Sequence, residues 1–256
     1  MTSVLYDATY EGWLTAVFDV YDHKLDDVIF AKNETSSNSL FGTTHQVVTD
    51  ETKVKRVLNG LQKRLSGEGL DRLSKTYLSE IDRVEDTMLR FVRHVFDNSQ
   101  SVEEDYSNPA VWAIRNAAKR VKREAHRMEA FVRFQLTKDQ LYYAVIEPEC
   151  DVLPLIAPHF ESRYADQRWL IYDTRRRYGL YYDLKTVNPV AVAFNQIRAS
   201  SLPIVEFSDE DEEFYQALWC HYLTSVTIEG RTNRRLQLQH MPKRYWRYLT
   251  EKRPRT

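Results

Sequence analysis

Histidine, aspartate and arginine side chains in the middle of the sequence could bind a phosphate group or transfer a proton. His159 and Arg163 are four residues apart in a helical pattern, so they share one helix face. Asp173 ends an apolar strand pattern, and Arg176 lies among the three arginines that follow. Arginine pairs well with phosphate, histidine carries a proton, and aspartate can fix the histidine tautomer. We expect these four side chains to form an anion site at one end of a sheet. A purely structural contact of His159 with Asp173 is the more common alternative.

A second candidate lies where a basic helix meets the next segment. We expect a strand over 131–136, on which Phe131 and Arg133 share one face because alternate strand residues point the same way. An aromatic ring beside a guanidinium can stack on a base and pair with a phosphate. An equally weighted alternative is that Arg133 bridges to a carboxylate on the next strand, such as Glu147. For acid–base chemistry, the candidates are His126, His159 and Asp173.

Charge in this 256-residue sequence is balanced in total but unevenly distributed. There are 36 Lys and Arg against 37 Asp and Glu, giving a net charge of −1. Basic residues gather over 115–138 and after 228, whereas acidic residues gather over 206–213, so a basic face is possible despite the neutral total. The alternative is a set of solvated helix surfaces. The residues predicted to bind nucleic acid are Arg115, Lys119, Lys122, Arg133, Arg163, Arg175, Arg176, Arg231, Arg234, Arg235, Lys243 and Arg244.

The basic C-terminal segment also contains aromatic residues. Tyr245, Trp246 and Leu249 are expected to dock this tail on the core, which leaves its arginines outward to meet phosphates, bases or an acidic protein.

Several classes of function lack their sequence signatures. We find no phosphate-binding G-x-x-x-x-G-K-[ST] loop, no dinucleotide-binding glycine motif and no G-x-S-x-G elbow. Neither H-E-x-x-H nor C-x-x-C occurs, so these motifs give no support for a metal, and we expect no cofactor. Two cysteines cannot hold a three-cysteine iron–sulfur cluster. We see no signal peptide or membrane-length apolar run, and we expect a cytoplasmic protein that does not contact a membrane.

Periodicity predicts an α+β protein. We expect a mainly helical region over 1–105, with a short strand at 4–6 and helices at 11–20, 51–65, 70–79 and 82–97. The polar stretch 98–108 is the expected domain boundary, although the two parts could form one continuous domain. Over 106–256 we expect a long helix capped by Asn108, an antiparallel or mixed ββαββ sheet, a helix over 209–228 and the basic tail. Residues 33–44 are expected to form a loop.

The long helix is expected to have two distinct faces. One carries a buried seam, formed by Val111, Ile114, Ala118, Val121, Ala125 and Met128. A neighbouring face carries a cationic stripe of Arg115, Lys119, Lys122 and His126.

The sequence resembles a bacterial family known as probable DNA metabolism proteins, most clearly over residues 80–252. The matching signatures are His126-Arg127-Met128, Phe131-Val132-Arg133-Phe134, Pro148, His159-Phe160-x-x-Arg163, Trp169-x-Ile171-x-Asp173-x-x-Arg176, Gly179-x-Tyr181-Tyr182-Asp183, Arg231-x-Asn233-x-Arg235-Leu236-Gln237 and His240-Met241-Pro242-x-x-Tyr245-Trp246-x-x-Leu249-x-Glu251. The resemblance implies association with a radical-SAM protein of presumed DNA repair or modification role. Some members are fused to a uracil-DNA-glycosylase-like domain, which we expect this chain to lack. The family has no agreed catalytic residues, so none is transferred.

Three hypotheses follow. The first is a nucleic-acid-binding accessory protein in DNA metabolism, favouring DNA over RNA and working with a radical-SAM partner. The second is an enzyme acting on nucleic acid through a His/Asp/Arg site. The third is a protein–protein adaptor without nucleic-acid contact. A concave pocket containing His159, Asp173 and arginines would favour the enzyme, whereas an open arginine and aromatic surface would favour the binding protein.

Overall fold

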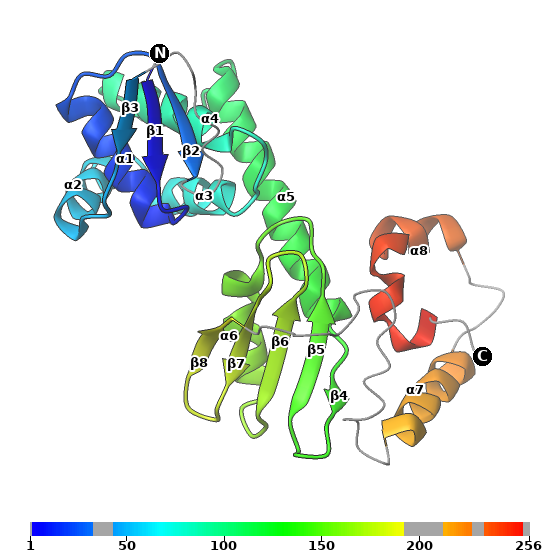
Figure 1. The fold of residues 1–256 in the computed structure, drawn as a ribbon. Coiled ribbons are helices and arrows are strands. Elements are labelled where there is room, and N and C mark those ends of the chain that lie inside the picture. The colour runs from blue at the N-terminus through cyan, green and yellow to red at the C-terminus, as the bar shows by residue number, and fades with distance from the viewer. Residues whose placement is uncertain (1, 33–42, 192–211, 227–232, 253–256) are drawn as a thin grey trace. The chain divides into compact units, whose positions relative to one another are not determined.

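The computed structural model describes residues 2–32, 43–191, 212–226 and 233–252 (Figure 1). Helices and strands are both well represented, which confirms the α+β prediction. The chain forms two compact units, residues 1–122 and 123–256, which divide within the long helix α5 (Pro109–Phe131). The expected boundary near residue 105 stays a prediction. In the described part of the chain, no helix is both long and apolar enough to cross a membrane.

The first unit contains a three-stranded parallel sheet and several helices. Its strands are β1 (Thr2–Tyr6), β2 (Val28–Lys32) and β3 (Thr43–Gln46), in the order β2-β1-β3. The helices are α1 (Tyr10–Asp22), α2 (Glu51–Gln62), α3 (Gly67–Tyr77) and α4 (Val84–Asp97). The helix predictions are confirmed within a few residues at each end. The second and third strands were not predicted, and the part of the expected loop at 33–42 lies outside the described residues.

Local capping explains where the first helices begin. Thr9 accepts a hydrogen bond from the Gly12 N–H at the start of α1, and Asp50 accepts from Thr52 and Lys53 at the start of α2. Apolar side chains on one face of each helix then reach the core of the unit, where Trp13, Leu61 and Met88 are fully buried.

The second unit contains a five-stranded mixed sheet. Its strands are β4 (Gln135–Leu136), β5 (Tyr142–Ile146), β6 (Trp169–Asp173), β7 (Tyr178–Tyr182) and β8 (Val187–Val190), in sequence order across the sheet. Only β5 and β6 are parallel, and α6 (Leu153–Arg163) connects them. The ββαββ prediction is therefore confirmed, with β8 as an additional antiparallel edge.

The C-terminal segment of the second unit is mostly helical. It comprises α7 (Glu212–Val226), α8 (Arg234–His240) and two short 3-10 turns, η4 (Lys243–Tyr248) and η5 (Thr250–Lys252). The Leu136 N–H of β4 donates to the Glu212 carboxylate at 2.9 Å, which places the start of α7 beside this edge strand. The acidic run 209–211 and Arg231 lie outside the described residues.

Helix α5 has the two faces that its sequence predicts. The six residues of the apolar seam are all buried, and the Asn108 side chain accepts from the Ala110 N–H at 2.9 Å. The four members of the cationic stripe are exposed. The helix also continues through Phe131, so the strand expected over 131–136 is wrong except for Gln135 and Leu136. The Val132 N–H still donates to Met128 at 3.0 Å, which extends the helical pattern past the expected strand start.

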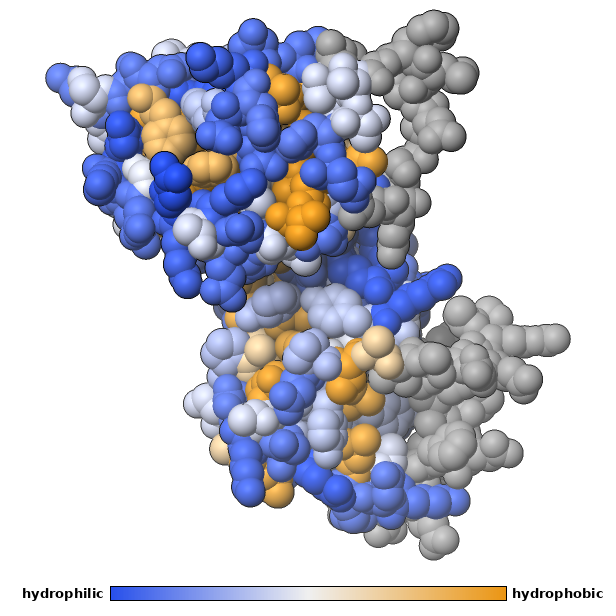
Figure 2. All heavy atoms as spheres, turned by 60° about the vertical axis from the view of Figure 1, so that its left-hand side comes forward, coloured by the Kyte–Doolittle hydropathy of each residue, from blue (hydrophilic) through white to orange (hydrophobic). Residues whose placement is uncertain are grey.

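Figure 2 shows one face of the molecule, on which hydrophilic side chains predominate and apolar side chains gather in small patches. Isolated exposed apolar residues, such as Val48 and Trp112, are ordinary features of a folded surface.

Candidate nucleic-acid interface

A cavity of about 900 Å³ lies in the second unit, bounded by the end of α5, strands β4 and β5, and helices α6 and α7. Ligand pockets commonly measure roughly 300–1,000 Å³, so this cavity is large enough for a small organic ligand. We call it the aromatic hollow because five of its lining residues are Phe134, Tyr142, Phe160, Tyr164 and Trp219.

The aromatic rings on one side of the hollow form a packed cluster. Phe134 lies edge-on to Phe160 and Tyr164, with ring centroids 5.7 and 5.3 Å apart. Phe160 is buried and packs against Trp169 in the strand below, whereas Phe134 and Tyr164 are only partly buried. This arrangement holds two partly exposed rings against a buried aromatic base, and partly exposed rings of this kind can stack on a flat ligand.

The charged groups of the hollow differ in how they are paired. His159 and Arg163, one turn apart on α6, both line it, and Arg163 is exposed. Arg163 makes no ion pair with any described residue. In contrast, the Glu212 carboxylate already accepts hydrogen bonds from Leu136 and Gln216. The cation on α6 is therefore available to an anionic ligand.

Arg133 also lines the hollow, but it mainly fastens the C-terminal segment. Its guanidinium donates to Glu251 at 2.9 Å and to the backbone carbonyls of Ala130 and Val132, and it lies over the Trp219 ring. Sequence reasoning offered a carboxylate bridge as one alternative, but named Glu147 as the partner. Arg133 Nε–H is buried and has no hydrogen-bond partner among the described residues.

The ion pair also affects Glu251. Burial alone would raise the pKa of this carboxyl, but the hydrogen bond from Arg133, a backbone hydrogen bond, the charge of Arg133 and the hydrogen bond from Trp219 together lower the pKa. Glu251 is consequently ionised at neutral pH, when it connects the end of α5 to the tail.

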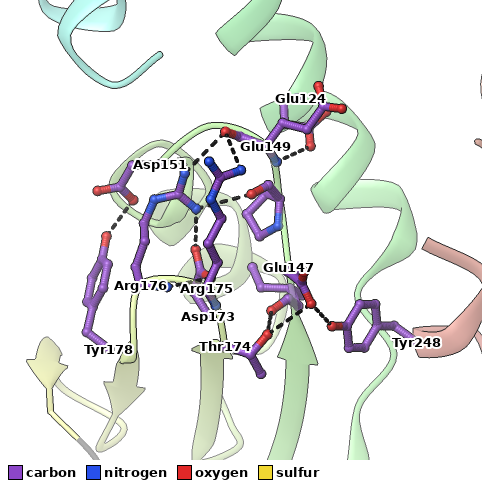
Figure 3. A network of polar contacts seen from close by, with 12 residues as sticks. Glu124, Glu147, Glu149, Asp151, Asp173, Thr174, Arg175, Arg176, Tyr178 and Tyr248 are labelled. Atoms are coloured by element: carbon purple, nitrogen blue, oxygen red, sulfur yellow. Dashed lines mark hydrogen bonds and ion pairs between the residues drawn. The ribbon is translucent and has the colours of Figure 1, made fainter. Parts of the chain in front are cut away.

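A second group of charged residues in the same unit is joined by hydrogen bonds and ion pairs (Figure 3). We call this group, which includes Asp173, Arg176 and Glu124, the polar network. The Asp173 carboxylate is fully buried and accepts from Arg176 at 2.6 Å and from the Arg175 and Arg176 N–H groups. Arg176 is only 8% exposed and also donates to the carbonyls of Pro148 and Glu149. These contacts fix the turn between β6 and β7.

Glu124 of α5 extends the polar network to the tail. Its buried carboxylate accepts from the Tyr245 hydroxyl at 2.6 Å, from the Glu149 N–H at 2.8 Å and from Arg244 at 3.3 Å. Burial, assisted by the neighbouring Glu124 charge, raises the pKa of Tyr245, so its phenol stays protonated and donates. Tail docking is thus confirmed, with Tyr245 and Leu249 as its buried anchors. Trp246 is only partly buried, so it is a weaker anchor than the sequence suggested.

The expected site of His159, Arg163, Asp173 and Arg176 does not form. Phe160, next to His159, packs on Trp169 at the first residue of β6. Asp173 is four residues further along this strand, roughly 13 Å away at the usual rise. Two of the four residues therefore line the hollow, and the other two belong to the polar network. The Asp173 carboxylate bonds within its own hairpin, to Arg176, and no contact with His159 is found among the described residues.

The remaining predicted residues occupy different settings. Arg115 is exposed and lies over the Tyr106 ring in the first unit, and Lys119 and Lys122 are exposed. His126 is exposed beside Glu129 at the rim of the hollow. Arg175, Arg234, Arg235 and Lys243 are exposed, whereas Arg244 is engaged with Glu124 and Glu149. Tyr142, Tyr164 and Trp219 also line the hollow but were not predicted, because tertiary packing brings them together from separate elements.

The fold and site together define an α+β protein with an aromatic, histidine- and arginine-lined hollow in its C-terminal unit. Residues 82–251 match a family described as a domain of unknown function (DUF4130), and the chain belongs to this family. The matched segment contains every residue that lines the hollow and almost all of the described tail. No curated protein matches the sequence.

Proposed function

We propose that this chain binds single-stranded nucleic acid, and that an unpaired base enters the aromatic hollow. The observation that carries the proposal is the combination of partly exposed rings with His159 and Arg163 on one wall. Aromatic rings can stack on any base, and an arginine can pair with the phosphate next to that base in the strand. A duplex would have to unpair before a base could reach the hollow, so single strands should bind better.

The biological setting of the proposal rests on family resemblance. It favours DNA over RNA and an accessory role in DNA repair or modification alongside a radical-SAM enzyme. In this role the chain would hold an exposed or damaged strand while the partner performs the chemistry. Co-purification with the partner, followed by identification of the bound nucleic acid, tests this part of the proposal separately.

Catalysis on nucleic acid is the second candidate function. The observation that favours it is the concave form of the hollow, because an active site is expected to be concave and a binding surface to be open. His126 and His159 both line the hollow and could exchange protons with a ligand. Asp173 is not available to orient either histidine, because it is committed to Arg176. Incubation of labelled single strands with the protein would reveal cleavage or base release, and loss of that product in His159→Gln would support catalysis.

Fluorescence anisotropy with a labelled single strand tests the binding proposal. We expect affinity to fall as salt rises, because phosphate contacts release counterions, and we expect a duplex of equal length to bind more weakly. Arg163→Gln should weaken binding by about tenfold, equivalent to roughly 1.4 kcal/mol. Arg90→Gln is a matched control that removes one exposed arginine from α4. Equal affinities for both variants and wild type would contradict the assignment of Arg163.

A further inference from the structure

Two histidines and an aspartate gather in the first unit, outside the residues that match the family. Asp19 comes from the last turn of α1, His23 is the residue that caps the C-terminal end of this helix, and His45 comes from the edge strand β3. One potential ligand atom from each side chain lies within 4.8 Å of those of the other two. Imidazole nitrogen and carboxylate oxygen are common ligands of zinc and related ions.

The three side chains combine a fixed pair with an adjustable third member. The Asp19 side chain is 6% exposed, and its Oδ2 lies 2.9 Å from Nε2 of His45. Ligand bonds of about 2.0–2.1 Å in a tetrahedral site imply ligand atoms roughly 3.3 Å apart, so only a small separation of this pair is required. His23 is exposed, and its ring centroid lies 5.1 Å from that of His45, so side-chain rotation can bring its nitrogen into position.

Lys53 both supports and opposes this arrangement. Its Nζ donates to the other Asp19 oxygen, Oδ1, at 2.7 Å, which leaves Oδ2 to face His45. Carboxylates that bind metals are usually held by such an outer hydrogen bond. The ammonium charge would nevertheless repel a divalent cation, so Lys53 should weaken binding without blocking the ligand oxygen.

We propose that Asp19, His23 and His45 form a binding site for a divalent transition-metal ion of the zinc class. Three protein ligands leave a fourth position for water. The bound ion would fasten the edge strand β3 to α1, because its ligands come from both elements. This proposal concerns the first unit and does not depend on nucleic-acid binding by the second.

Isothermal titration of the full-length, chelator-treated protein with zinc chloride provides the test. We expect one zinc ion per chain at this site. His23→Ala should weaken binding by about tenfold or more, and should leave the circular dichroism and melting temperature of the metal-free protein unchanged because this side chain is exposed. His45→Ala should also weaken binding, although it removes a partner of Asp19.

Two further variants distinguish this site from nonspecific histidine binding. His94 is another histidine of the same unit that pairs with a carboxylate, because its Nε2 lies 3.1 Å from Asp105. His94→Ala should leave the zinc affinity unchanged. Lys53→Gln should tighten binding, by about fivefold, because it removes the repelling charge but keeps a donor for Asp19. Absence of zinc binding to the wild type would overturn the proposal, as would a wild-type affinity in His23→Ala.

Discussion

The aromatic hollow and the polar network use similar side chains for different purposes. In the polar network, buried Asp173 is matched by Arg176, and buried Glu124 by Tyr245 and a backbone N–H. In the hollow, the exposed Arg163 has no ion-pair partner among the described residues. Both regions contain arginines, so the presence of arginine alone does not tell them apart. They differ in whether the guanidinium is paired with a carboxylate: a paired arginine makes a structural contact, and an unpaired one is available to a ligand. We expect substitutions in the polar network to affect stability, and those in the hollow to affect binding.

The largest expected effect on stability comes from Asp173→Ala. Removing the carboxylate leaves the Arg176 guanidinium buried without its counter-charge, which typically costs about 3–5 kcal/mol. Thermal unfolding should show a melting temperature several degrees below that of the wild type. At a temperature where the variant remains folded, its affinity for a single strand should be unchanged. A stable variant that has lost binding would place Asp173 in the binding site and break the comparison.

Tyr245→Phe should have a smaller effect. It removes the hydroxyl that donates to the Glu124 carboxylate, and a hydrogen bond to a charged group contributes about 1.5–3 kcal/mol. Chemical denaturation measures this loss. Tyr181→Phe is the control, because Tyr181 is partly exposed and makes no hydrogen bond through its hydroxyl with any described residue, so its change should stay within about 0.5 kcal/mol. Equal losses for the two variants would show that the Glu124 contact does not hold the tail.

Acid should weaken the attachment of the tail through Glu251. Its pKa is lowered from the ordinary value of 4.5 in the folded protein. The resulting stabilisation is fully present above that ordinary value and is lost as the pH falls through the lower, folded pKa. Denaturation from pH 7 to pH 3 should therefore show that Glu251→Gln changes stability less with pH than the wild type does. If the stability of both proteins depends on pH in the same way, Glu251 does not contribute to the loss of stability in acid.

The smallest effect on stability is expected from the cationic stripe of α5. Replacing Arg115, Lys119 and Lys122 together with Gln alters exposed side chains, so the melting temperature should change little. If the stripe contacts phosphates, binding should weaken and the dependence of affinity on salt should become less steep. An unchanged salt dependence, measured by anisotropy, would restrict the interface to the hollow.

The sequence predicts local features of this protein well. The buried seam of α5 follows from helical spacing and from the cap at Asn108, both of which depend on neighbours in the chain. The ββαββ order likewise follows from apolar runs and turns. Strand β3 was missed because Thr43–Gln46 is a short, polar edge strand without the alternation that marks a half-buried strand.

Side-chain partners were much harder to predict, because they depend on how helices and strands that are distant in the sequence pack against one another. His159 and Asp173 could have met if α6 had crossed the sheet toward the far end of β6. Instead, α6 packs near Trp169 at the beginning of that strand. Arg133 was correctly considered for a carboxylate bridge, but its partner Glu251 is 118 positions away in sequence. No spacing rule connects residues across such a distance.

The entry of a base into the aromatic hollow can be measured with a single strand that carries the fluorescent base 2-aminopurine. Stacking on Phe134 or Tyr164 should quench its fluorescence when the wild-type protein binds. Tyr164→Leu, which removes a partly buried ring at the hollow, should reduce the quenching, whereas Tyr181→Leu should not. If anisotropy reports binding while 2-aminopurine remains as bright as in the free strand at every position tested, bases do not enter the hollow, and our central proposal is wrong.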